Sequence, residues 1–206
     1  MKKLQAGLAT LLLLVFSSCS LELSFTLKND NSLDVTLEAG GGESFTKMLF
    51  DAAGVEDSAI DVKQLESELS NSGFTNVQCE NKGDGDSSSK VQIKFTDAGL
   101  KSYIFTSGLL LVDGGKLELN LAKEKLVNFY NVCDEQTRML LDLFLAPVFN
   151  DESMTEEEYL EMLGTFYGQS CADEIKSTDI KIRLTDCDKT FKVIKIPLSS
   201  LMCTKD

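Results

Sequence analysis

The chain has 206 residues, of which 43% are hydrophobic, and it carries 20 basic against 33 acidic side chains. These values are typical of a folded protein with one domain, or one domain and a small subdomain. The chain contains no histidine and no tryptophan, which excludes Ser-His-Asp and Cys-His catalysis and zinc sites built with histidine. The formal net charge of -13 disfavours binding to nucleic acid or to anionic lipid headgroups.

The N-terminus has the architecture of a signal peptide. Lys2 and Lys3 form a short basic region, residues 7–16 form an apolar run of ten, and Ser17, Ser18 and Cys19 follow directly. A membrane-spanning helix needs about 20 apolar residues, so this run is too short for a permanent span. We therefore expect residues 1–18 to be a cleaved signal peptide.

The sequence Phe16-Ser17-Ser18-Cys19 resembles the lipobox of bacterial lipoproteins, in the relaxed form of spirochaetes. The resemblance implies cleavage before Cys19 and diacylglycerol and acyl groups such as palmitate on that residue. It also implies a lipid-anchored protein of the bacterial cell envelope that faces the periplasm, with the outer membrane favoured because Ser20 is not aspartate. The alternative is an ordinary secretory signal, cleaved after Ser18 or Ser20, with no lipid. Cleavage before Cys19 removes two lysines and no acidic residue, so the mature net charge is -15.

Strand patterns, in which apolar and polar residues alternate, occur near both ends of the mature chain and in its middle. They cover residues 21–27, 33–38, 74–80, 90–96, 100–112, 116–121, 179–185 and 191–198. Polar or glycine-containing turns separate successive pairs, so we expect hairpins. Because the first strand begins two residues after Cys19 with no long polar tether, we expect the domain to sit against the bilayer.

Helical spacing of apolar residues occurs in residues 44–53 and 61–71 and again between residues 123 and 176. Within the later region we predict helices over residues 123–133, 134–149 and 155–167. The expected fold class is α+β, an antiparallel sheet built of hairpins with helices packed on one face. Residues 19–206 are expected to form a single domain with a helical insert at about 123–176.

The opening of the mature chain, Cys19 followed by the alternating segments Leu21–Lys28 and Leu33–Leu37, is similar to that of LppM-type bacterial lipoproteins. That family combines an anchored N-terminus with an α+β domain associated with envelope lipids. The resemblance therefore implies a lipid-binding role, and it carries over no site residue.

The segment Met139–Phe149 is apolar around nearly its whole helical circumference, interrupted by Asp142 and Pro147. A helix of this kind is buried or contacts lipid. One interpretation is that it lines a cavity for acyl chains or touches the membrane, and the other is that it is the central helix of the insert core. The candidate ligand-binding residues are Met139, Leu140, Leu143, Phe144 and Val148.

Five cysteines remain after Cys19 is assigned to lipid, and an odd number leaves at least one unpaired within the chain. Two bridges among the five can be drawn in fifteen ways. Cys171 precedes the first strand of the terminal hairpin and Cys203 follows the second, so both lie at its open end, whereas Cys187 lies at the turn. This placement favours a Cys171–Cys203 disulfide.

No motif for a metal, a nucleotide, haem or another cofactor is present, and we expect a binding protein rather than an enzyme. The predicted function is a membrane-anchored envelope lipoprotein that binds a hydrophobic or lipid ligand close to the membrane. The alternative is a structural or adaptor lipoprotein that contacts another envelope protein through an acidic face or a sheet edge, with no small ligand.

Overall fold

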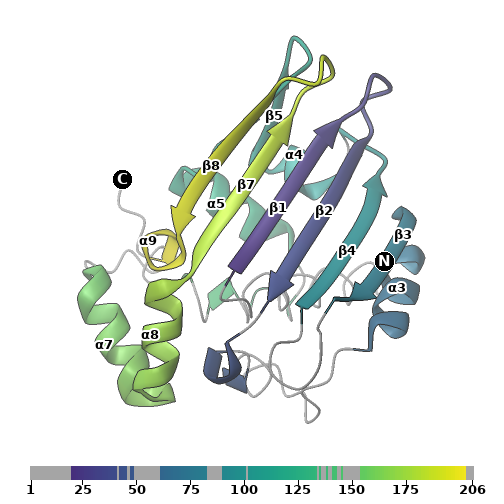
Figure 1. Cartoon of the computed structure of the whole chain (residues 1–206). Coiled ribbons are helices and arrows are strands. Elements are labelled where there is room, and N and C mark those ends of the chain that lie inside the picture. The colour runs from purple at the N-terminus through teal and green to yellow at the C-terminus, as the bar shows by residue number, and fades with distance from the viewer. Residues whose placement is uncertain are drawn as a thin grey trace.

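Figure 1 shows the computed structural model of the chain. It describes residues 20–40, 42–45, 47–48, 61–82, 90–100, 102–133 and 154–202, together with residues 135, 138, 141, 142 and 145.

The centre of the described fold is a six-stranded sheet with the strand order β3-β4-β2-β1-β7-β8. Its strands are β1 (Ser20–Leu27), β2 (Leu33–Gly40), β3 (Thr75–Asn81), β4 (Lys90–Asp97), β7 (Asp179–Thr185) and β8 (Phe191–Pro197). Neighbouring strands are antiparallel, except that β1 and β7 run parallel to each other. The predicted α+β class is confirmed, and the sheet is antiparallel as expected except at the parallel β1–β7 pair.

The two faces of the sheet differ in polarity because apolar and polar residues alternate along its strands. Figure 1 shows α4, α5 and β5 behind the sheet. The apolar face is buried through Leu21, Phe25, Leu27, Leu33, Val35, Leu37, Ala39, Val91, Ile93, Phe95, Ile180, Ile182 and Leu184. The opposite face carries charged and hydroxyl side chains, so one face of the sheet supplies the core and the other is polar.

Two of the described helices begin at a capping side chain. The described helices are α3 (Val62–Asn71), α4 (Tyr103–Thr106), α5 (Lys123–Val132), α7 (Glu156–Tyr167), α8 (Gln169–Ser177) and α9 (Leu198–Met202). The Asp61 carboxylate accepts hydrogen bonds from the backbone N–H groups of Lys63 and Gln64, at 2.9 and 3.1 Å. Thr155 and Glu158 form a complete capping box before α7. Both caps satisfy backbone donors that a helix start otherwise leaves unpaired.

A separate two-stranded sheet, formed by β5 (Leu110–Asp113) and β6 (Lys116–Leu119), corrects one prediction. The sequence predicted a strand over residues 100–112, but the first part of that run contains α4. Short apolar runs fit a buried strand or a buried helix turn equally well. The predicted turn itself is confirmed, because Gly114 and Gly115 both have positive φ, as a tight two-residue hairpin requires.

The helical region before β7 also differs from the expectation in one respect. The helix predicted over residues 155–167 is confirmed as α7, and a distinct helix, α8, follows it after Gly168 alone. Gly168 has φ of 95°, a conformation that other residues rarely adopt. The chain therefore reverses at one glycine and forms a helical hairpin. Most of the segments predicted as helices over residues 44–53 and 134–149 lie outside the described residues.

Candidate functional site

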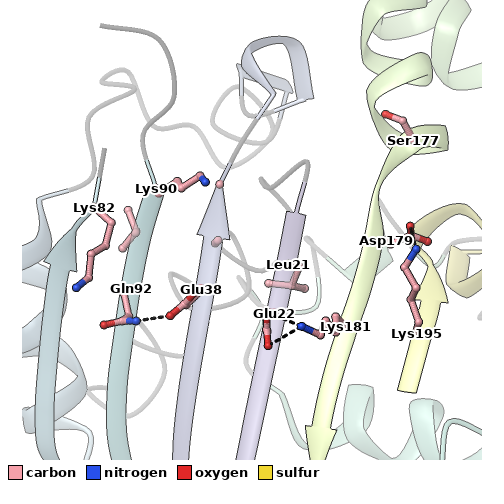
Figure 2. A pocket seen from close by; sticks show the side chains of 13 residues that line it. Leu21, Glu22, Glu38, Lys82, Lys90, Gln92, Ser177, Asp179, Lys181 and Lys195 are labelled. Atoms are coloured by element: carbon pink, nitrogen blue, oxygen red, sulfur yellow. Dashed lines mark hydrogen bonds and ion pairs between the residues drawn. The ribbon is translucent and has the colours of Figure 1, made fainter. Parts of the chain in front are cut away.

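An open pocket of about 670 Å³ lies at the end of the main sheet where β1 begins. Figure 2 shows it on the polar face. Its lining comes from five strands and the loops beside them, with α8 at one side. The lining residues are Leu21, Glu22, Glu38, Ala39, Gly40, Lys82, Lys90, Val91, Gln92, Ser177, Asp179, Lys181 and Lys195.

The strand register brings most of the charged lining residues together. One polar residue from each strand lies in a line across the sheet, and we call this line the charged row. Its members, from β3 to β8, are Glu80, Gln92, Glu38, Glu22, Lys181 and Lys195. The row is acidic over β3, β2 and β1 and basic over β7 and β8, so the pocket floor has two electrostatic halves.

Ion pairs and one amide satisfy most charges along the row. Lys181 Nζ lies 3.0 Å from Glu22 Oε1, and Lys195 Nζ lies 2.5 Å from Asp179 Oδ2. The Gln92 side chain donates to the Glu38 carboxylate. Glu22 and Glu38 face each other in the register, an arrangement that is unfavourable for like charges. The flanking amine and amide offset this repulsion.

Two further lysines stand at the β3–β4 side of the pocket. Lys82 Nζ lies 2.8 Å from Glu80 Oε2. The hydrogen bond and the charge of Glu80 raise the pKa of Lys82, and those of Lys82 lower the pKa of Glu80. Lys90 has no ion-pair partner among the residues that the structure describes. Its aliphatic stem lies over Gly40, where an added Cβ would come within 3.0 Å of Lys90 Cγ. The Lys90 ammonium is therefore available to a ligand.

The residues predicted to bind a ligand cannot be compared with this pocket. Met139, Leu140, Leu143, Phe144 and Val148 lie outside the described residues, as does Cys19. Leu141 and Leu145, from the same apolar segment, belong to the hydrophobic core, and each exposes 3% of its surface. These two positions agree with the alternative interpretation of a core helix.

Sequence reasoning missed the pocket residues. The alternation in β1 and β7 marked Glu22 and Lys181 as residues of a polar strand face. However, it contained no signal that these strands are neighbours, because 159 positions separate the two residues in the chain. The register of the folded sheet is what brings them together.

Cys79, Cys171 and Cys187 are free thiols. Cys171 is fully buried, and its Sγ lies 3.5 Å from Met48 Sδ. Burial raises the pKa of Cys171 and of Cys79 to about 11, with a smaller contribution from a nearby glutamate in each case. Cys203 lies outside the described residues and Cys171 is a free thiol, so the structure gives no support to the predicted Cys171–Cys203 disulfide.

Within the described ranges, no group of three or more cysteine, aspartate or glutamate side chains could hold a metal ion. The same residues include no helix that is long and apolar enough to cross a membrane. Comparison of the chain with protein-family models, with curated proteins and with solved structures finds no significant match.

Proposed function

We propose that the protein is a lipoprotein of the bacterial cell envelope, anchored through Cys19, that binds the polar headgroup of a membrane lipid in the pocket beside the anchor. The observation that carries this proposal is the position of Ser20. Ser20 is the first residue of β1 and pairs with Gly40 and Asp179, two residues that line the pocket. Cys19 is covalently joined to Ser20, so a lipid on it would lie within a few ångströms of the pocket end of the sheet.

The charges of the lining support a zwitterionic headgroup as the ligand. Four lysines (Lys82, Lys90, Lys181, Lys195) and three carboxylates (Glu22, Glu38, Asp179) line the pocket. A headgroup with a phosphate and an amine, such as that of phosphatidylethanolamine, offers a partner to both kinds of side chain. The lysine that is unpaired among the described residues is the natural contact for the phosphate, because hydrogen bonds to ionised groups are the strong ones.

Lipidation is tested by growing a bacterial host that expresses the full chain with labelled palmitate. We expect the protein to take up the label and the Cys19→Ala variant to take up none. An unlabelled protein, or equal labelling of the variant, would contradict the anchor.

Headgroup binding is tested with residues 20–206 and native mass spectrometry in the presence of short-chain phosphatidylethanolamine. We expect Lys90→Ala to weaken binding about tenfold, since a hydrogen bond to a charged group contributes roughly 1.5 kcal/mol or more. Lys192→Ala is the matched control, because Lys192 is an exposed lysine of β8 that does not line the pocket. No bound lipid, or equal affinities for the two variants, would refute the proposal. Phosphatidylglycerol, which lacks the amine, should bind more weakly than phosphatidylethanolamine.

The adaptor role is a second candidate, which the β8 edge of the sheet favours. β8 pairs with β7 alone in the sheet order, and its Phe191 and Val193 are exposed. An exposed edge strand can pair with a strand of another protein. A photocrosslinker at Lys192 tests this role in cells. A single envelope protein captured there, and not from a crosslinker at Lys63 on α3, would support the adaptor role.

A further inference from the structure

The reversal between α7 and α8 presents two aromatic side chains to solvent. Phe166 and Tyr167, the last residues of α7, expose 75% and 42% of their surfaces. Gly168 reverses the chain there, and its N–H donates to the Gly164 carbonyl at 3.0 Å. We call residues 164–170 the hairpin tip. Phe166 is more exposed than any other large hydrophobic residue described in the chain.

The hairpin tip also lies in an uncharged stretch of an otherwise highly charged protein. Between Glu161 and Asp173, eleven consecutive residues carry no ionisable acid or base of the Asp, Glu, Lys or Arg kind, although 26% of the chain is of these types. A net charge of -13 repels anionic surfaces over most of the molecule. The tip is therefore a part of the surface that has no charged side chain of its own.

The two helices pack against each other behind the tip. Tyr159 and Leu163 of α7 and Cys171 and Ile175 of α8 are buried, whereas the aromatic pair lies outside this cluster. The two helices are in close contact at this point, since a Cβ added at Gly164 would lie 3.2 Å from Gln169 Oε1 and 3.5 Å from Ala172 Cβ. The exposure of the aromatic pair thus belongs to a packed hairpin and does not require a change of conformation.

The fold places the tip beyond the end of the sheet at which Ser20 lies. α8 leads through Thr178 into β7, whose first residue, Asp179, pairs with Ser20. Figure 1 shows α7 and α8 extending past this end of the strands. The nine residues of α8 correspond to about 13 Å at 1.5 Å per residue. A lipid anchor on Cys19 would hold the sheet end at the bilayer surface, with the tip projecting from the same end.

We infer that the hairpin tip inserts Phe166 and Tyr167 into the headgroup region of the bilayer that holds Cys19, and so fixes the orientation of the domain on the membrane. The inference rests on the proposed lipid anchor. Aromatic side chains are favoured at the membrane–water interface, where the ring is partly desolvated and the tyrosine hydroxyl reaches water. Insertion of an apolar surface by roughly 5–10 Å is common for interfacial protein segments, which agrees with the projection of the tip. In this orientation the pocket end of the sheet lies next to the lipid surface.

The absence of tryptophan from the chain gives a direct test. Phe166→Trp introduces a single fluorophore at the tip, and Tyr167→Trp is a second reporter in case the first variant does not fold. Phe191→Trp is the matched control, since Phe191 is 56% exposed and pairs with Thr185, the last residue of β7. It lies about 20 Å from Asp179 at 3.3 Å per residue, away from the anchor end. The full chain is extracted from bacterial membranes and reconstituted in phosphatidylcholine vesicles with or without brominated acyl chains.

We expect the tip tryptophan to show a blue-shifted emission in vesicles and to lose intensity when the acyl chains carry bromine. The Phe191→Trp control should keep the emission of an exposed tryptophan and should not be quenched. Equal behaviour of the two reporters would overturn the inference. A blue shift that depends on protein concentration and not on bromine would assign the tip to a contact between copies and would also overturn it.

Labelling of the same preparations with palmitate separates this inference from the proposed anchor. A labelled chain whose tip tryptophan is unquenched retains the anchor and contradicts insertion of the tip. An unlabelled chain whose tip tryptophan is quenched contradicts the anchor and supports insertion.

Discussion

Gly99 is the position at which a single added methyl group has the clearest structural consequence. It follows β4 and has φ of +100°. A Cβ at this position would lie 2.1 Å from the backbone oxygen of Asn31 and 3.0 Å from its carbonyl carbon. Asn31 belongs to the turn between β1 and β2, so Gly99→Ala drives the loop after β4 against that turn. The obstacle is backbone, which cannot rotate away as a side chain can.

The free-energy cost of Gly99→Ala has two parts, and Gly73→Ala isolates one of them. Gly73, at the end of α3, has φ of +95°, and a Cβ there meets no atom within 4 Å. An alanine at positive φ costs about 1–2 kcal/mol, and this is the whole cost expected for Gly73→Ala. Gly99→Ala carries the same strain and adds the displacement of packed backbone, for which overpacking gives about 1–3 kcal/mol. We therefore expect a total of about 2–5 kcal/mol for Gly99→Ala.

Urea unfolding of residues 20–206 followed by circular dichroism measures both values. The m-value should be unchanged, because the surface exposed on unfolding is the same, so the difference appears in the midpoint. Substitutions without a specific contact typically change the free energy of unfolding by no more than about 0.5 kcal/mol. If the free energies of unfolding of the two variants agree within that range, the close approach of Gly99 to Asn31 is refuted.

The remaining predictions concern helix capping and the titration and reactivity of the cysteine thiols. Thr155→Ala removes both hydrogen bonds between the Thr155 hydroxyl and Glu158 at the start of α7. It should lower the free energy of unfolding by about 1 kcal/mol. Thr165→Ala, at an exposed position of the same helix, should have little effect in the same urea titration. Burial raises the pKa of Cys79 and Cys171 from 9.0 to about 11. As pH rises, these thiols therefore lose their protons in the unfolded chain before they do in the folded protein. The free energy of unfolding should consequently fall as pH rises from about 9 to about 11. A pH-independent urea midpoint over that range would contradict buried thiols. At pH 8, a maleimide should modify the half-buried Cys187 before either of them.

Local patterns predicted the elements whose residues are close in sequence. The alternation of residues 21–27 and 33–38 predicted the β1–β2 hairpin, and the same pattern predicted β7 and β8 around the turn at Asp186–Lys189. The helical spacing from residue 155 predicted α7, which begins after the Thr155 cap. These predictions succeeded because strand alternation, turn residues and helix caps act over a few neighbouring residues.

The prediction failed where a local pattern was ambiguous. The apolar residues between Leu100 and Val112 have strand propensity, but α4 occupies part of this run. Gly168 alone separates α7 from α8, and a single glycine within a helical pattern does not distinguish an interruption from a reversal. Packing of the two helices against each other decides between these outcomes.

The sequence by itself determined the amphipathic strands, the capped helices, the acidic character of the domain and the expectation of a lipid on Cys19. Only the tertiary structure decided which strands are neighbours. The parallel pairing of β1 with β7 aligns Glu22 with Lys181 and Ser20 with Asp179. This pairing completes the charged row and places the end of α8 beside Ser20. Periodicity reports which face of a strand is buried, but the choice of a distant partner depends on the packing of the whole core, to which residues far apart in the chain contribute together.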